Sequence, residues 1–203
     1  MSPQPLRADA ARNARRIVDA AYSVFAAGGV TVPMEEIADA AGVGVATLYR
    51  RFPHKQDLVR AVLEARFDEV IAPVLARAAS LDDPREGVYV ALEAAVGLAA
   101  AEQPLFAAAN NVGALTMDLA WRFFSPVAAL VASGQATGTF RADLVPDDVP
   151  RLVLMLVGTL PSFPATASDG WRRYLDLLMD ALAPAGASEL SPASAVADHT
   201  PRI

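Results

Sequence analysis

The sequence predicts an all-α protein, and three observations carry this prediction. Alanine, the strongest helix former, occurs 43 times in 203 residues, and 54% of the chain is hydrophobic. Apolar residues recur at three- and four-residue spacing along most of the chain, as in amphipathic helices. The alternation of apolar and polar residues that marks a half-buried strand is absent from the sequence. We therefore expect helices that pack around a sizeable core.

The first predicted helix spans residues 9–27. Ile17, Ala21 and Phe25 fall on one face of it at helical spacing, so this face is expected to be buried. Gly28-Gly29 ends the helix, because glycine readily adopts the positive φ of a C-terminal cap.

Two short helices are predicted next, at 33–41 and 45–51. Gly42-Val43-Gly44 separates them, and Gly42 can adopt the left-handed conformation that a tight turn requires. Pro53 ends the second helix, because the residue before a proline disfavours helical geometry. Two short helices that cross through a glycine turn are typical of a helix-turn-helix.

The rest of the chain is predicted as longer helices. One begins near Lys55 and continues toward Ala79, with Pro73 as a kink or an end inside it. The later predicted helices are 85–101, 104–111, 113–133, 146–160 and 168–183. Residues 184–203 are rich in Ala, Ser and Pro and have little periodicity, so we expect a disordered tail there.

Charge is distributed unevenly along the chain. The net charge is −6, yet residues 1–55 carry a net +2 and residues 56–203 a net −8. This asymmetry favours an N-terminal segment that meets an anion and a C-terminal body that does not. A non-specific architectural DNA binder would be basic overall, so the composition argues against that class.

The composition leaves little chemistry for an enzyme or a metal protein. Cysteine is absent, which excludes disulfides, thiolate metal sites and cysteine nucleophiles. His54 and His199 lie far apart in sequence, and Asp147-Asp148 lies in an apparent loop without partners. We expect no enzymatic activity, no cofactor and no metal.

The N-terminus lacks a signal peptide, and the most apolar run, 152–160, is too short to span a bilayer. We therefore expect a cytoplasmic protein without a membrane partner.

The residues in and around the second short helix fall into two sets, one expected to be buried and one expected to be exposed. The side chains expected in a small shared core are those of Ile37, Ala41, Val43, Leu48 and Phe52. The side chains expected on the outside are those of Val45, Ala46, Thr47, Tyr49, Arg50 and Arg51. A helix of this size fits the major groove of B-DNA, where its side chains reach base edges.

At these positions the sequence resembles a known family. The residues that carry the resemblance are Ile37-Ala38, Ala41-Gly42-Val43, Thr47-Leu48-Tyr49, Phe52 and Lys55-Gln56-Asp57-Leu58. Together they make the span 12–68 similar to the DNA-binding domain of TetR/AcrR-type transcriptional regulators. The resemblance implies a homodimeric repressor that binds a double-stranded operator and is released when its C-terminal domain binds a small molecule. We expect a helix-turn-helix domain at 9–54, a connecting helix at 55–80 and an effector-binding and dimerisation domain at 81–183.

The resemblance also assigns DNA contacts. It places Val45, Ala46, Thr47 and Tyr49 at the groove, and Arg51, Lys55 and again Tyr49 at phosphates. Gly44 departs from the family pattern, because a serine or an acidic residue often caps the recognition helix there. Val45 and Ala46 have no side-chain hydrogen-bonding group. Operator affinity is therefore expected to depend more on Arg50, Arg51, Lys55 and the N-terminal arginines Arg7, Arg12 and Arg15.

Two further sets of residues are candidates in the C-terminal part. Those for an effector pocket are Phe106, Asn110, Met117, Trp121, Phe124 and Met155. For any single member of this set, filling an ordinary core is the more common role. Their character favours a mostly apolar or aromatic effector. Those for a homodimer interface are Leu152, Leu156, Trp171, Leu175 and Leu178, because two strongly apolar helices need cover from more than one side.

The sequence leaves open how the regulator acts. The same fold could serve an activator, or a regulator controlled by a partner protein instead of a small molecule.

Overall fold

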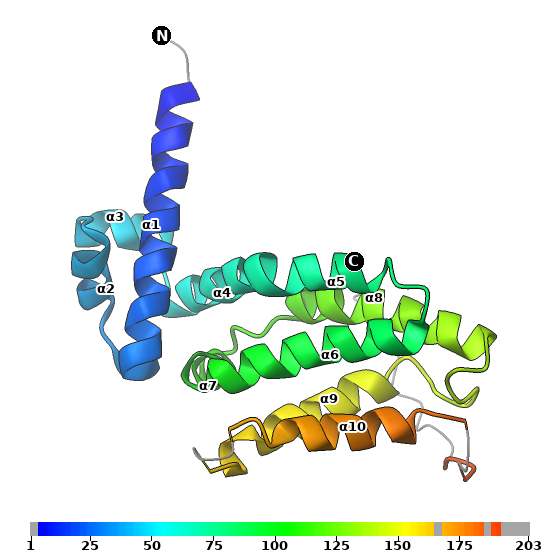
Figure 1. Cartoon of the computed structure of the whole chain (residues 1–203). Coiled ribbons are helices and arrows are strands. Elements are labelled where there is room, and N and C mark those ends of the chain that lie inside the picture. The colour runs from blue at the N-terminus through cyan, green and yellow to red at the C-terminus, as the bar shows by residue number, and fades with distance from the viewer. Residues whose placement is uncertain (1–3, 165–167, 185–187, 192–203) are drawn as a thin grey trace.

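Every regular element in the described part of the chain is helical, which confirms the all-α prediction (Figure 1). The computed structural model describes residues 4–164, 168–184 and 188–191. The α-helices are α1 (Gln4–Gly28), α2 (Met34–Ala41), α3 (Val45–Arg51), α4 (Lys55–Arg66), α5 (Ala72–Ala78), α6 (Pro84–Ala101), α7 (Gln103–Asn111), α8 (Met117–Ala136), α9 (Asp148–Thr159) and α10 (Trp171–Ala181). Three short turns lie between them: η1 (Gly29–Thr31), η2 (Phe67–Ile71) and η3 (Leu160–Ser162).

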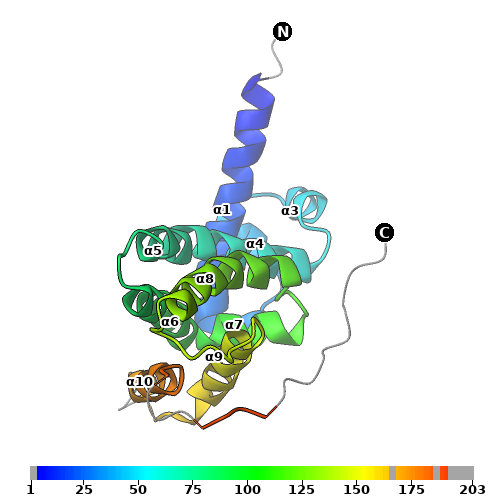
Figure 2. The same cartoon turned by 90° about the vertical axis from the view of Figure 1, so that its right-hand side faces the viewer.

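The N-terminal core lies between α1, α2, α3 and α4. Ile17, Phe25, Ile37, Leu48 and Leu58 are at most 1% exposed and belong to one apolar cluster. The two short helices have the predicted bounds to within a residue, whereas α1 begins before the predicted residue 9. Both views place α3 next to α1 and far from α9 and α10 (Figure 1 and Figure 2).

The helix predicted at 55–79 is interrupted near its middle. α4 ends at Arg66, and the wider π-helical turn η2 connects it to α5. Within this turn the Ala72 amide donates to the Phe67 carbonyl, one residue further back than in an α-helix. Pro73 follows directly. Its ring lacks an amide proton and crowds the carbonyl four residues earlier, so a wider turn relieves the conflict.

The C-terminal half is centred on α6. This helix packs against α5 and α8 on one side and against α9 and α10 on the other (Figure 1). Leu92, Val127, Phe140 and Leu175 are at most 1% exposed in its apolar cluster. The ring of Phe140 lies against Gly134, where a Cβ would come within 2.3 Å of it. Glycine is therefore required at that point of α8.

The last helices are shorter than predicted. α8 begins at Met117 instead of residue 113, because Gly113 adopts a φ of +65° and the Thr116 hydroxyl accepts the Leu119 amide at 3.4 Å as a cap. Most of the predicted tail, 184–203, lies outside the described residues. Its described part at 188–191 is bound to the body, since Arg141 donates to the Ser188 carbonyl at 2.5 Å.

No single helix in the described residues combines the length and apolar composition needed to cross a bilayer. α6 and α7 meet that test only as a pair, and they are bent by 88° where they join.

Candidate nucleic-acid interface

The turn between α2 and α3 depends on Gly42. Its φ of +61° lies in the left-handed region that favours glycine, as predicted. Its amide donates to the Asp39 carbonyl at 3.0 Å, and the Val43 amide donates to the Ala38 carbonyl at 3.0 Å. These two bonds close the C-terminal end of α2 in the manner of a Schellman motif. The chain can then turn directly into α3.

Helix α1 fixes the same turn from outside. The Arg16 guanidinium donates to the Ala41 carbonyl at 2.7 Å and to the Gly42 carbonyl at 3.3 Å. A cation at this place also interacts favourably with the negative end of the α2 dipole. Arg16 therefore positions the helix-turn-helix against α1, a role that no local pattern of residues predicts.

Helix α3 presents a polar and small-residue surface on the side away from the core. Leu48 is fully buried and anchors the helix, and Phe52 is 5% exposed just after it. The exposed residues are Val45, Ala46, Tyr49, Arg50 and Arg51, and Thr47 is partly exposed. The core and surface sets therefore divide as the pattern predicted, with Val43 half-buried.

The N-terminus of α3 lacks a side-chain cap. Gly44 holds the cap position in extended geometry, and no side chain bonds to the first amides of the helix. The Gly44 carbonyl instead accepts the Thr47 amide at 2.8 Å. Free amides at the positive end of a helix attract anions.

Tyr49 and Lys55 are already bonded within the helix-turn-helix. The Tyr49 hydroxyl donates to Glu35 Oε1 at 3.1 Å, and this bond raises the pKa of Tyr49. The Lys55 ammonium donates to the Val32 carbonyl. Partial burial lowers the pKa of Lys55, and the nearby charge of Glu35 opposes that shift. Glu35 thus lies beside two of the three residues that the resemblance assigns to phosphates, Tyr49 and Lys55.

The predicted N-terminal arginines lie along α1. Arg12 and Arg15 are exposed, and Arg15 pairs with Asp19 at 3.2 Å. The side chain of Arg7 lies outside the described residues.

A buried ionic cluster joins the two halves of the molecule. Glu102, at the end of α6 and 8% exposed, accepts the Tyr22 hydroxyl at 3.1 Å and the Arg66 guanidinium at 2.8 Å through the same oxygen. Its other oxygen, Oε2, is buried without a hydrogen-bond partner in the described part of the chain. Arg66 also pairs with Glu69 at 2.7 Å and lies over the Tyr22 ring at 4.8 Å. The cluster connects α1, the end of α4 and the end of α6.

The six effector-pocket candidates do not come together. Met117, Trp121 and Met155 are 80%, 70% and 68% exposed, and Asn110 is exposed as well. This corrects the expectation of a shared lining. The inward face of α8 is formed by residues such as Phe123 and Val127, so Met117 and Trp121 lie on the opposite face. Phe106 is half-buried and packs between the two apolar clusters.

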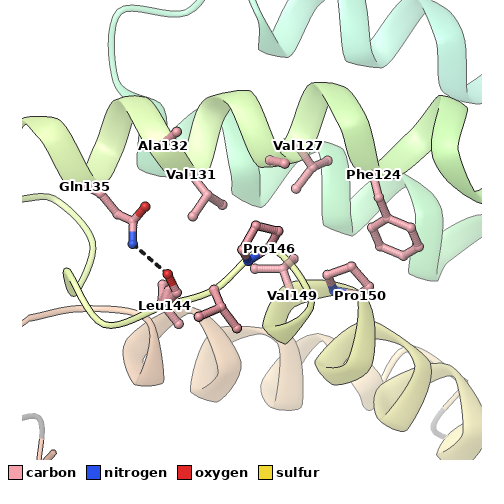
Figure 3. A pocket seen from close by; sticks show the side chains of 11 residues that line it. Phe124, Val127, Val131, Ala132, Gln135, Leu144, Pro146, Val149 and Pro150 are labelled. Atoms are coloured by element: carbon pink, nitrogen blue, oxygen red, sulfur yellow. Dashed lines mark hydrogen bonds between the residues drawn. The ribbon is translucent and has the colours of Figure 1, made fainter. Parts of the chain in front are cut away.

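Phe124, the sixth candidate, lines a small hollow between α8 and the segment that leads into α9 (Figure 3). The hollow has a volume of about 80 Å³. Its walls are mostly apolar: Phe124, Val127, Ala128, Val131, Ala132, Leu144, Val145, Pro146, Val149 and Pro150. Gln135 is the polar member, and its amide donates to the Leu144 carbonyl at 3.0 Å (Figure 3).

The five dimer candidates also require a correction. Trp171, Leu175 and Leu178 are 3%, 0% and 9% exposed, and Leu156 is 7% exposed. Leu152 is partly buried against the same cluster. These side chains fill the core of their own subunit, because the more apolar stripe of each helix faces inward. The outward faces of α9 and α10 carry a different exposed set: Leu154, Met155, Tyr174 and Leu177.

The comparisons agree with this geometry. The family model described as "Bacterial regulatory proteins, tetR family" matches residues 17–62, which span the helix-turn-helix. A TetR transcription regulatory protein of Mycobacterium vanbaalenii is 33% identical, with a TM-score of 0.59 over 88% of this chain and 99% of that one. The chain belongs to the TetR family of bacterial transcriptional regulators.

Two further similar proteins extend over most of the chain. The HTH-type transcriptional repressor KstR2 of Rhodococcus jostii is 26% identical over 203 residues, covering 90% of this chain and 98% of that protein. A transcriptional regulator of Saccharomonospora viridis, solved in complex with choline, shares the fold at 22% identity. It has a TM-score of 0.68 over 84% of this chain and 96% of that one.

Sequence reasoning missed three residues of this TetR-family regulator that organise the site. Arg16, Glu35 and Glu102 each act through a partner at least 14 residues away in the chain. Periodicity within one helix does not reveal contacts between segments this far apart.

Proposed function

We propose that this TetR-family regulator is a homodimeric repressor whose α2–α3 unit binds an operator and which a mostly apolar small molecule releases. The exposed face of α3 is the observation that carries the DNA-binding part. Thr47 and Tyr49 supply hydrogen-bonding groups, and Arg50 and Arg51 add positive charge at the end of the helix. Such a face suits base edges in the groove together with phosphates at its rim.

The outward faces of α9 and α10 support the homodimer. Leu154, Met155, Tyr174 and Leu177 are 51–68% exposed there, and large apolar side chains gathered at a surface favour burial against a partner. Two subunits joined by these helices would present two recognition helices to one face of DNA. Half-sites about 34–36 Å apart on a near-palindrome are then expected.

Repression and small-molecule control are supported by similarity and by the hollow beside α8. KstR2 is a repressor, and the regulator of Saccharomonospora viridis binds choline. In this chain the walls of the hollow are mostly apolar, and its one amide is engaged by backbone carbonyls, which favours an apolar effector. Ligand sites usually span about 300–1,000 Å³, so binding would require the 144–150 segment to move away from α8.

Contacts between α8 and η2 offer a route from that hollow to the DNA. Arg122 on α8 pairs with Asp68 at 2.5 Å and lies over the Phe67 ring at 4.3 Å. Both partners belong to η2, which continues directly from α4. A shift of α8 would therefore move η2 and α4, and with them the helix-turn-helix that precedes α4 in the chain. A differential effector affinity of a few kcal/mol between the two arrangements is enough for release.

DNA binding is tested with Arg51→Ala and Thr47→Ala, measured by fluorescence anisotropy on a fragment from the chain's own upstream region and on random duplex. Arg51→Ala should weaken both and reduce the salt slope by about one. Thr47→Ala should mainly lose the preference for the upstream fragment. Arg77→Ala, a change at an exposed arginine on α5, is the matched control. An unchanged salt slope in Arg51→Ala would remove that residue from the interface.

Dimerisation is tested with Leu177→Glu, analysed by sedimentation velocity. Because Leu177 is 53% exposed, the variant should fold and sediment as a monomer with reduced affinity for a palindromic operator. Leu115→Glu makes the same change at a 46% exposed leucine between α7 and α8 and should remain dimeric. Dimers in Leu177→Glu would place the interface on another surface.

Effector binding is tested with Ala128→Leu, which fills the hollow, against Ala129→Leu on the neighbouring outward position. A screen of apolar metabolites should yield compounds that release DNA from the wild type and from Ala129→Leu but not from Ala128→Leu. If no compound releases DNA, control by a partner protein becomes the better interpretation.

A further inference from the structure

Glu35 lies in an unexpected place for a protein that binds a polyanion. It is in the first turn of α2, and its carboxylate accepts the Tyr49 hydroxyl at 3.1 Å across the helix-turn-helix. The ammonium of Lys55 donates to the Val32 carbonyl and also interacts electrostatically with the Glu35 carboxylate. The family resemblance assigns Tyr49 and Lys55 to DNA phosphates. One acidic side chain therefore stands beside both.

A phosphate and the Glu35 carboxylate compete for the same donors. A phenol has a single proton and donates one good hydrogen bond at a time, so Tyr49 cannot donate fully to both acceptors. The ammonium of Lys55 attracts either anion, and two anions gathered around it repel each other. A phosphate that binds Tyr49 must displace the carboxylate or accept its repulsion.

We propose that Glu35 is a negative determinant of DNA affinity, which holds Tyr49 in the free protein and imposes a cost on every phosphate that approaches Tyr49 and Lys55. This inference rests on the proposed function, operator binding by the α2–α3 unit, and on the phosphate contacts that the family resemblance assigns to those two residues. Phosphates carry no sequence information, so the cost applies to operator and random DNA alike. Glu35 would thereby limit the retention of the regulator on non-operator DNA.

The neighbouring Glu36 provides a matched control. It is exposed in the same first turn of α2 and carries the same charge, and both carboxylates favour the positive end of the helix dipole. A change to glutamine removes one charge at either position and costs α2 about the same. The two variants differ in the position of the removed charge relative to Tyr49 and Lys55.

The experiment measures anisotropy of the full chain on the upstream fragment and on random duplex, over a series of NaCl concentrations. Glu35→Gln should tighten binding to both duplexes about three- to tenfold and steepen the salt dependence. Glu36→Gln should change affinity less than about twofold. In a Tyr49→Phe background, which lacks the hydroxyl, the gain from Glu35→Gln should shrink because the two residues are coupled.

The contrary results are equally definite. If Glu35→Gln binds no more tightly than Glu36→Gln, Glu35 imposes no specific cost and the proposal is overturned. If Glu35→Gln binds more weakly than the wild type, the carboxylate assists DNA binding by positioning Tyr49, and the proposal is overturned as well. If the gain is unchanged in Tyr49→Phe and confined to one duplex, a sequence-independent competition through Tyr49 is also overturned. If the wild type binds neither duplex, the proposed function fails and this inference fails with it.

Discussion

Leu175→Ala and Leu177→Ala, two residues apart on α10, are expected to have opposite consequences for folding and assembly. Leu175 is 0% exposed, whereas Leu177 is 53% exposed. Truncation of a buried leucine removes three carbons, about 2.4 kcal/mol of transfer free energy, and the cavity left behind adds to that loss. Leu175→Ala should therefore lower the free energy of unfolding by about 3–4 kcal/mol. Leu177→Ala should lower it by less than about 1 kcal/mol at protein concentrations where the dimer persists.

Urea unfolding followed by far-UV circular dichroism measures both effects. The titrations are repeated at several protein concentrations, because the stability of a dimer depends on concentration. Leu175→Ala should shift the midpoint at every concentration. Leu177→Ala should approach the wild type at high concentration and fall below it on dilution. Equal losses in the two variants, or a Leu175→Ala variant within about 1 kcal/mol of the wild type, would refute the assignment of inward and outward faces.

Three further outcomes are expected. Glu102→Ala leaves the largely buried Arg66 guanidinium with one partner fewer, so it should lower the free energy of unfolding by about 2 kcal/mol in the same titration. Gly42→Ala places a Cβ on a residue whose φ is +61°, so it should lower the free energy of unfolding by about 1–2 kcal/mol. DNA binding should be lost where the turn between α2 and α3 unfolds. The hydrogen bonds from Arg141 hold the pKa of Asp143 at about 2 instead of 3.8. The ion pair therefore stabilises the fold above about pH 4 and is lost as the pH falls toward 2, and Asp143→Asn should flatten that acid limb of the stability curve.

The helix-turn-helix could be predicted closely because its signals are local. Gly42 ends α2 at the position where the turn needs a left-handed residue, and Pro53 prevents α3 from continuing. The position of Leu48 relative to Tyr49 then follows from helical periodicity, so the buried and exposed sides of α3 were available from the sequence.

The C-terminal half was harder because periodicity shows that a helix has an apolar stripe without showing what covers it. Trp171, Leu175 and Leu178 form such a stripe on α10, and it is covered by α6 and α9 of the same chain. Met117 and Trp121 are as apolar as core residues, yet they lie on the outer face of α8. The assignment of faces depends on helix packing between distant segments, which one sequence does not encode in any short window.

The placement of α7 bears on how regulators of this kind can be recombined. Leu105 and Ala109 of α7 are 1% and 0% exposed, and they complete the apolar cluster of α1–α4 rather than that of the C-terminal half. A DNA-reading unit cut from this chain after α4 or α5 would therefore lack part of its own interior. An engineer who grafts it onto a foreign sensor must also bring α7, or supply side chains of matching shape. The unit of exchange is thus discontinuous in sequence, because the 36 residues 67–102 separate α4 from α7.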